Sequence, residues 1–346
     1  MLKRTLFFSN PYHLSVKMGQ LEITDKKTGE IKTAPIEDLG FVVFDNQEIT
    51  FTQSVMTELA ANNTAVIICN NKHLPASMMF HLDTNQIQNE LFRAQVSASE
   101  PLKKQLWQQT VKQKIRNQAA VLDLTSARLT LNLRSQPSVV SPAGEGLEER
   151  GARGEAGGGK RGDALRRIAT QVKSGDSTNE EAQASRRYWK NLFGENFTRE
   201  RDGMPPNPSL NYGYAILRAA VARALCGSGL LPTLGIFHHN KYNHYCLADD
   251  IMEPYRPYVD KMVWEQKEKH SDYHNLNKER KAELLSVLSC DVMLPSPSPL
   301  SLGRGGGGEA GVRHPLLVAV SQTTASLVKC FSGEEKKILY PDLQGF

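Results

Sequence analysis

The stretch NQIQNELFRAQVSASEPLKKQLWQQTVKQKIRNQAAVL, residues Asn85–Leu122, marks a change in the hydrophobic pattern of this 346-residue chain. Apolar residues recur there every three or four positions, which is typical of amphipathic helices. The pattern predicts two helices, Asn85–Ser99 and Pro101–Leu122. Pro101 suits the first turn of the second helix because no N–H is needed there. Most of the assignable sequence after this point is helical as well.

The residues before Asn85 have the pattern of strands, because short runs rich in β-branched and aromatic side chains alternate with turn residues. The predicted elements are strands in Lys3–Ser9, Tyr12–Ile23, Ile36–Asn46 and Thr64–Cys69, a hairpin turn at Thr24–Glu30 and a short helix at Thr52–Asn63. The sequence therefore predicts an α+β fold. A β-rich N-terminal domain, residues 1–84, precedes a larger, mainly α-helical domain, residues 85–346.

Two low-complexity runs, Arg134–Gly162 and Leu294–Arg313, interrupt the helical part and consist mostly of Gly, Pro, Ser, Arg and Glu. Such sequence buries too little apolar surface to offset the cost of ordering it. We interpret both runs as inserted, disordered surface loops. Their anchors, about Ser126 with Asp163 and Met293 with His314, should then be neighbours. The alternative is a pair of basic, flexible arms that bind nucleic acid.

The composition limits the class of protein. A formal net charge of +5 permits a polyanionic partner without requiring one. The chain has neither a signal-peptide pattern nor an apolar run long enough for a membrane span. Its five scattered cysteines favour reduced thiols in the cytoplasm. The common glycine-rich nucleotide motifs and the GxSxG hydrolase motif are absent.

Glu181 is the first candidate for chemistry. Helical spacing places it on one face with Ala184, Ser185 and Tyr188. Apart from Glu181, this face therefore carries small or apolar residues. Two overlapping capping boxes, Ser177 with Glu180 and Thr178 with Glu181, compete for one helix start, so one glutamate is left over.

The segment Leu234–Asp260 holds the second group of candidates. Its histidines and acids within sixteen positions are His238, His239, His244, Asp249, Asp250 and Glu253. Imidazole and carboxylate groups together form a ligand set for Mg²⁺ or Mn²⁺. The alternative is that the histidines are ordinary packed or surface residues and the acids complement a helix dipole. Spacing alone leaves both interpretations open.

Six quoted stretches occur in an order that resembles a known family: KRTLFFSNPYHLSVKMGQL, QNELFRAQVSASEPLKKQLWQQTVKQKI, NEEAQASRRYW, PPNPSLNYGYAIL, LGIFHHNKYNHYCLADDIMEPYRP and SQTTASLVKCFSGEEKKILYPDL. The family is the integrase of CRISPR adaptation, the first of the Cas proteins, and the detailed pattern is similar to type II systems. The likeness covers nearly the whole chain except the two low-complexity runs.

The resemblance implies one divalent metal ion, Mg²⁺ or Mn²⁺, bound by Glu181, His238 and Glu253. Asp250 is an accessory candidate, and His239 is the alternative to His238 because the doubled histidine leaves the register open by one. Glu180 then takes the capping role, and the inward-facing carboxylate is that of Glu181.

The resemblance also implies a metal-dependent DNA endonuclease and integrase that inserts spacers into a CRISPR array by 3′-OH transesterification, in antiviral defence. The implied partners are double-stranded and branched DNA, a second copy of the chain through the N-terminal domain, the small second Cas protein and the type II effector nuclease. The alternative is a catalytically inactive DNA-binding or assembly subunit from a decaying gene copy, since the two insertions depart from the family.

Spacers vary in sequence, so DNA contacts should be made mainly to phosphates. The basic candidates are Lys103, Lys104, Lys112, Lys114, Arg116, Arg186, Arg187 and Lys241. For each of them the alternative is a solvated helix face. Asn211 and Tyr212 are expected to brace helix packing at the metal site.

Overall fold

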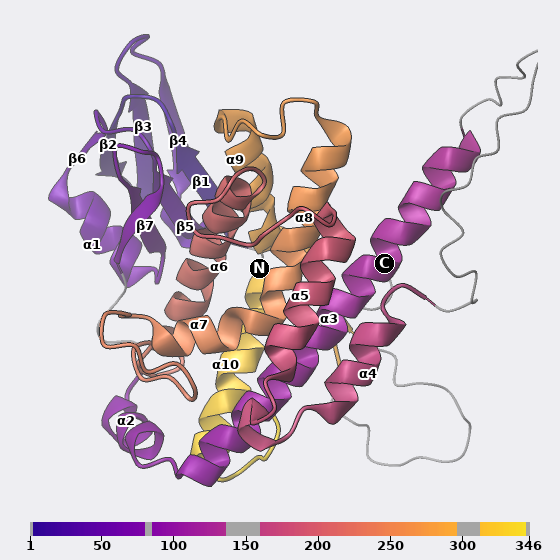
Figure 1. Ribbon diagram of the computed structural model, residues 1–346. Helices are drawn as coiled ribbons and strands as arrows, with labels where there is room; N and C mark the ends of the chain where they lie inside the picture. Colours follow the sequence, from indigo (N-terminus) through magenta and orange to yellow (C-terminus); the bar gives the residue numbers. More distant parts are fainter. Residues whose placement is uncertain (1–2, 80–84, 136–159, 296–311, 344–346) are drawn as a thin grey trace, which may run out of the picture.

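The computed structural model describes residues 3–79, 85–135, 160–295 and 312–343 (Figure 1). Strands make up the N-terminal part and helices nearly all of the rest. In Figure 1 the indigo strands lie beside a group of packed helices, and α6 is next to the sheet. The predicted α+β fold class is therefore confirmed.

Two four-stranded sheets form the N-terminal part, with strand orders β1-β5-β7-β8 and β4-β3-β2-β6. The elements are β1 Arg4–Phe8, β2 Tyr12–Lys17, β3 Gln20–Asp25, β4 Ile31–Pro35, β5 Leu39–Phe44, β6 Thr50–Phe51, α1 Gln53–Ala61, β7 Ala65–Cys69 and β8 Pro75–Met79. The other predicted strands, the turn and the short helix are present, but the predicted strand Tyr12–Ile23 is a hairpin of β2 and β3, which turns at Met18 and Gly19 with positive φ angles. Strands β4, β6 and β8 were not predicted; the β8 sequence PASMM has no β-branched residue to signal a strand.

Strand β5 joins the two hydrophobic cores of the protein. All six of its residues are buried. Val42 and Phe44 pack into the smaller core with side chains from β2, β3 and α1. Phe41 and Val43 point to the opposite face, since side chains alternate along a strand, and join the large core of the helices. The sheet is therefore one wall of the helical part.

The helices are α2 Gln88–Val96, α3 Glu100–Ser135, α4 Asp163–Gln171, α5 Glu180–Phe193, α6 Asn207–Gly227, α7 Cys246–Met252, α8 Arg256–Lys269, α9 Lys278–Leu285 and α10 Leu316–Ser332. Helix α3 packs against α4, α5 and α8; it is longer than predicted and continues to Ser135. Trp107, Val111 and Ile115 are buried along one side of α3. The spacing of these residues is the helical period predicted from the sequence, and Trp107 at one end of this side packs against Phe237.

The second low-complexity run begins and ends in a β-hairpin. Strands β9 (Asp291–Leu294) and β10 (Val312–Pro315) pair antiparallel, with Leu294 opposite Val312 and Met293 opposite Arg313. The expectation that the anchors are neighbours is confirmed. The predicted boundaries were wrong by a few residues, because Leu294, Val312 and Arg313 belong to the strands. Residues 296–311 lie outside the described part.

The first low-complexity run ends against α3. The N–H of Gly162 donates to Oδ1 of Asp123 at 2.7 Å, and Arg166 pairs with Oδ2 of the same residue at 2.6 Å. A Cβ atom at Gly162 would lie 2.3 Å from the carbonyl oxygen of Ala119, so only glycine permits this approach. The predicted proximity of Ser126 and Asp163 is confirmed to within one helical turn. Residues 136–159 are not described, and disorder of the two runs stays a prediction.

Two further expectations concern the whole chain. No helix in the described ranges is both long and apolar enough to cross a membrane. No disulfide joins any of the five cysteines, all of which belong to those ranges. Burial raises the pKa of the Cys69 thiol, at the end of β7, to about 12.

Candidate metal site between α3, α5 and α7

Helix α5 begins at a cap made by Asp176. Its carboxylate accepts the backbone N–H groups of Glu180 at 2.9 Å and Glu181 at 3.1 Å. The predicted capping boxes and the capping role of Glu180 were therefore wrong. Asp176 lies close enough because Gly175 and Asn179 adopt left-handed backbone conformations that fold the segment back. The cap leaves the Glu181 side chain available for another partner.

That partner is Lys114 of α3. Its Nζ lies 2.5 Å from Oε1 of Glu181 and 2.5 Å from Oε2 of Glu253. The Lys114 side chain is only 9% exposed, so its prediction as a DNA-binding residue was wrong. Burial alone would lower the pKa of Lys114, but the charges of Glu253 and Glu181 outweigh burial and raise it. Two carboxylates far apart in the sequence thus meet at one positive charge.

Glu253 lies in the short 3₁₀ helix η3 (Glu253–Tyr255), directly after α7. Burial would raise the pKa of its carboxyl group, but Arg256 and Lys114 outweigh this and lower it. Arg256 is 3.0 Å from Oε1. Oε2 is buried and accepts no hydrogen bond from the described residues, and Lys114 contacts it as an ion pair. Glu253 is therefore an ionised carboxylate held between two cations.

Asp250 of α7 organises the loop that carries the histidines. One carboxylate oxygen, Oδ2, accepts the N–H groups of Ile236 at 2.7 Å and Phe237 at 3.0 Å. The other, Oδ1, lies 2.5 Å from Nδ1 of His238. A Cβ atom at Gly235 would lie 2.4 Å from the carbonyl oxygen of His238 and 2.8 Å from Oδ2 of Asp250. Glycine at 235 is therefore what allows the loop to wrap around this acid.

The His238 ring is held from a second side by aromatic residues of α3 and the loop. Trp107 and Phe237 stack with ring centroids 4.2 Å apart, and Trp107 meets His238 edge-on at 5.6 Å. The hydrogen bond to Asp250 raises the pKa of His238, and the charge of Glu253 adds to this effect. His239 is exposed to solvent. Of the two histidines, His238 is the one that faces the acids.

The types of donor atom suit a divalent cation, but the side chains are not yet close enough together to hold one. Among the described residues, no group of three histidine, cysteine, aspartate or glutamate side chains lies close enough together to hold an ion. The carboxylates of Glu181 and Glu253 already share one cation, the Lys114 ammonium. The contact of His238 Nδ1 with a carboxylate leaves Nε2 for ligation, which is the usual arrangement of metal-binding histidines.

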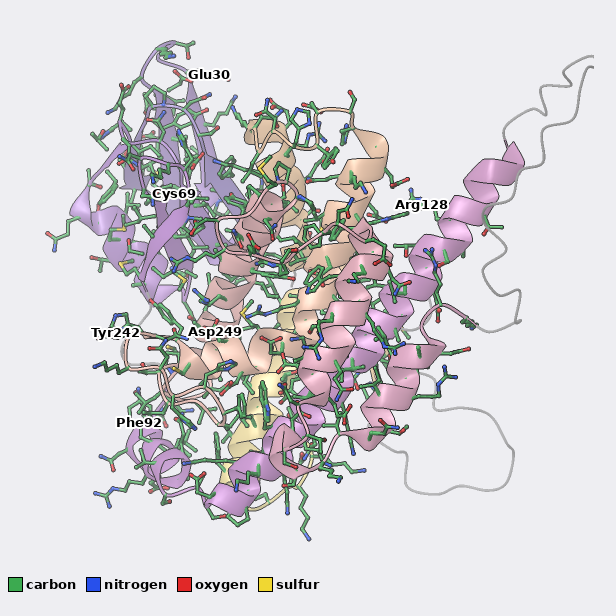
Figure 2. All side chains as sticks on the ribbon, viewed as in Figure 1. Glu30, Cys69, Phe92, Arg128, Tyr242 and Asp249 are labelled. Carbon is green, nitrogen blue, oxygen red and sulfur yellow. The ribbon has the colours of Figure 1, made fainter. Side chains whose placement is uncertain are left out.

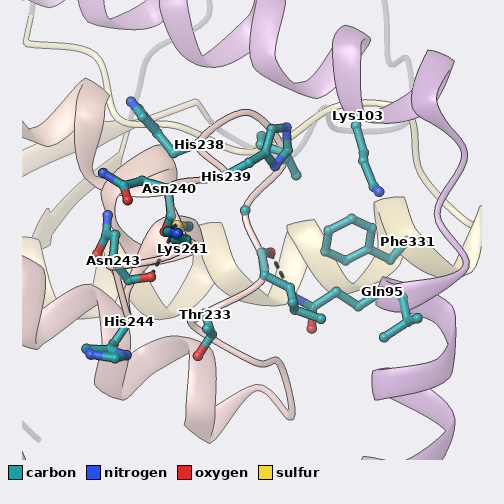
Figure 3. A pocket seen from close by; sticks show the side chains of 15 residues that line it. Gln95, Lys103, Thr233, His238, His239, Asn240, Lys241, Asn243, His244 and Phe331 are labelled. Atoms are coloured by element: carbon teal, nitrogen blue, oxygen red, sulfur yellow. Dashed lines mark hydrogen bonds between the residues drawn. The ribbon is translucent and has the colours of Figure 1, made fainter.

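A pocket of about 440 Å³ opens beside His238 (Figure 3). Figure 3 shows His238, His239 and His244 around it, together with Lys103 and Lys241. Neighbouring Asp249 does not face this pocket as a free acid, because it pairs with Arg218 at 2.6 Å and Asn243 at 2.7 Å. Figure 2 labels Asp249 on α7 and Tyr242 in the loop that precedes this helix.

Five of the remaining basic candidates lie on the helices and the loop that form this region. Arg186 and Arg187 are exposed on α5, the helix of Glu181, and Lys104 is exposed on α3. Lys103 pairs with Glu100 at 3.0 Å, and the Lys241 ammonium lies 4.9 Å from the centre of the Tyr242 ring. Lys112 and Arg116 lie on the opposite face of α3, where they line a different groove of about 1500 Å³.

Asn211 and Tyr212 do not brace the site as expected. Asn211 accepts a hydrogen bond from Arg199, and Tyr212 is buried near Cys69 and Asp45 of the N-terminal sheet. The basic residues that contact the acids are Lys114 and Arg256. Arg256 was not among the candidates, and Lys114 was predicted to bind DNA. A signal existed for Lys114: it follows Trp107 and Val111 at helical spacing and therefore continues the buried side of α3.

The fold is similar to that of several solved structures. A casposase bound to integration product superposes with a TM-score of 0.67 at 16% identity, covering 98% of this chain and 92% of that one. A Cas6-RT-Cas1–Cas2 complex gives a TM-score of 0.64 at 17% identity, covering 99% of this chain and 36% of that one. The fold is therefore of the class seen in these structures.

The sequence comparisons are more specific. The model of the family described as CRISPR associated protein Cas1 matches residues 6–285. The CRISPR-associated endonuclease Cas1 of Neisseria meningitidis serogroup C (strain 8013) is 38% identical over 260 residues, which is 75% of this chain and 74% of that protein. This chain belongs to the Cas1 family.

Proposed function

We propose that this chain is a metal-dependent DNA endonuclease and integrase that inserts new spacers into a CRISPR array. The relative from Neisseria carries the name endonuclease, and the structural neighbour with the higher TM-score of the two is a casposase bound to integration product. The first name describes a nuclease, and the second refers to the product of an integration reaction. The proposal extends both activities to this chain because its own residues provide a suitable site.

One observation carries the proposal. Glu181 and Glu253 come from different elements and direct their carboxylates at one buried cation. His238 faces the same region and is oriented by Asp250. Carboxylate oxygens and an imidazole nitrogen from three segments are the kind of ligands that Mg²⁺ or Mn²⁺ binds at sites of phosphoryl transfer.

The proposed reaction requires little covalent chemistry from the protein. In integration a DNA 3′-OH attacks a phosphodiester, so the nucleophile belongs to the substrate; one P–O bond forms while the bond from phosphorus to the 3′ oxygen of the target strand breaks. A divalent ion bound here would stabilise charge at phosphorus and lower the pKa of the attacking hydroxyl. The protein holds the reacting groups in line, and Glu181, Glu253 and His238 would hold the ion. The protein therefore needs no activated serine, cysteine or tyrosine as a nucleophile.

The partners follow from the same proposal. DNA would lie across the surface that carries Arg186, Arg187, Lys103, Lys104 and Lys241, with contacts mainly to phosphates, and binding would weaken as salt is added. A Cas1–Cas2 complex among the structural neighbours supports assembly with the small second Cas protein. A homodimer formed through the N-terminal sheets and contact with the type II effector nuclease are also part of the proposal.

The test uses purified full-length protein and an end-labelled branched DNA, with Mn²⁺ or with EDTA. We expect cleavage and strand joining in Mn²⁺ only. Glu181→Gln and Glu253→Gln should each reduce the rate by about 100-fold or more. Glu195→Gln is the matched control, since Glu195 follows α5 at the surface and pairs only with Lys190 among the described residues. DNA binding without turnover in the wild-type protein would favour the non-catalytic subunit instead.

A further inference from the structure

Lys114 lies between the two acids that are proposed as metal ligands. Its ammonium is 2.5 Å from both Oε1 of Glu181 and Oε2 of Glu253, and all three side chains come from different elements. The side chains of Lys114 and Glu253 are 9% and 4% exposed, so water screens the contact very little. The contact therefore decides how the two carboxylates are arranged.

Two ionised carboxylates that contact the same ammonium are close enough to repel each other unless a cation lies between them. The second cation nearby, Arg256, contacts Oε1 of Glu253 and does not bridge to Glu181. A divalent ion that binds Oε1 of Glu181 and Oε2 of Glu253 would therefore meet the ammonium of Lys114 directly. Two positive charges in direct contact repel each other strongly where water is excluded. The flexible four-carbon stem of lysine permits the ammonium to move away.

We propose that Lys114 is a built-in counter-cation of the Glu181–Glu253 pair, which a divalent metal ion must displace in order to bind. Lys114 is thus a positioning residue: it keeps the two carboxylates together while no metal is bound, and it lowers the affinity of the site for metal. The inference rests on the proposed function, because it takes the two acids as metal ligands.

An ordinary structural ion pair makes the opposite prediction. If Lys114 merely stabilised the fold, its removal would loosen the acids and weaken metal binding. A displaced counter-cation competes with the metal, so its removal must strengthen metal binding while it destabilises the metal-free protein. The sign of the change in metal affinity therefore separates the two roles.

The test measures the Kd of Mn²⁺ for the full chain by calorimetry at one fixed pH, together with the melting temperature with and without Mn²⁺. Lys114→Met removes the ammonium and keeps the length of the stem. We expect about tenfold tighter Mn²⁺ binding, a lower melting temperature without metal and a larger increase on adding metal. Lys112→Met is the matched control: it removes the same charge from the other face of α3 and should leave all three quantities unchanged.

Unchanged or weaker Mn²⁺ binding by the Lys114→Met protein would overturn the inference. The proposed function would still hold if the wild-type protein cleaved branched DNA in Mn²⁺. Mn²⁺ binding by neither protein overturns the inference too, and with it the metal dependence of the proposed function.

A second measurement uses wild-type protein and so does not depend on folding of the variant. Acetylation of Lys114 by limiting acetic anhydride, mapped by mass spectrometry, should increase on adding Mn²⁺, whereas acetylation of Lys112 should not. Equal labelling of Lys114 with and without bound Mn²⁺ would contradict displacement.

Discussion

The carboxylate of Asp250 holds both the ring of His238 and the backbone of the loop that carries it. Oδ1 lies 2.5 Å from Nδ1 of the imidazole, and Oδ2 accepts two backbone N–H groups from the same loop. Asp250 is completely buried. Since both of its oxygens are engaged by the loop, we expect Asp250 to act by orienting His238 rather than as a direct metal ligand.

Replacing Asp250 with asparagine should lower Mn²⁺-dependent DNA cleavage by about 10- to 100-fold, because the histidine loses the partner that fixes its orientation. Asp249→Asn is the matched control on the same helix, since Asp249 contacts Arg218 and Asn243 and not the ring or backbone N–H of His238. Its effect should be much smaller. Equal losses in the two variants would show that His238 does not depend on Asp250.

Gly235→Ala should displace the histidine loop. The new methyl group would overlap the carbonyl oxygen of His238 and Oδ2 of Asp250. Overpacking of this kind costs about 1–3 kcal/mol, and here it moves a candidate ligand. We expect a lower free energy of unfolding and reduced cleavage. Gly227→Ala is the control, because its nearest neighbour is 3.8 Å away. Normal activity of the Gly235→Ala protein would mean that the loop adapts without disturbing His238.

Asp260 should make stability depend on pH. It is buried on α8 and accepts hydrogen bonds from Tyr188 and Tyr214. Burial raises its pKa to about 7, although these two hydrogen bonds oppose the shift. Between its ordinary pKa of 3.8 and about 7, the folded protein binds a proton that the unfolded chain does not. The contribution of Asp260 to stability is therefore full at low pH and is lost as the pH rises through this window.

Asp260→Asn should remove that dependence, since asparagine stays neutral at every pH. The measurement is the free energy of unfolding in urea at pH 5 and at pH 8. We expect the decrease from pH 5 to pH 8 to be larger, by up to a few kcal/mol, in the wild-type protein than in the variant. The same decrease in both proteins would contradict a proton held by Asp260.

The β9–β10 hairpin should tolerate removal of the low-complexity run. Leu294 and Val312 are directly paired, so replacing residues 295–311 with Asn-Gly leaves a two-residue turn of a favoured type. The melting temperature should stay within about 2 °C, and Mn²⁺ binding should be unchanged. Loss of DNA binding by a protein that still melts cooperatively would show that the run is a basic arm with a function.

Much of the fold could be predicted because its elements bury one regular face. The buried sides of β5 and α3 repeat with the periods of a strand and a helix, and those periods are visible in the sequence. Strands β8, β9 and β10 are short, and β9 and β10 flank a low-complexity run. Their pairing depends on tertiary neighbours rather than on local pattern.

The site was predictable only in part. Residue types and spacing singled out Glu181 and the histidine–acid segment, while the choice of Glu181, His238 and Glu253 came from the resemblance to a family. Spacing within one segment does not show that Lys114 lies between two acids distant in sequence. The cap by Asp176 was missed for a similar reason, because it depends on a backbone reversal at Gly175 and Asn179.

The central claim is that Glu181, His238 and Glu253 share one divalent ion. An anomalous difference map from crystals soaked in Mn²⁺ tests it most directly. The account predicts a single strong peak within about 2.0–2.3 Å of oxygens from both carboxylates and of Nε2 of His238, with the Lys114 ammonium moved away. A map without a peak between Glu181 and Glu253, and with Lys114 still bridging them at saturating Mn²⁺, would contradict it.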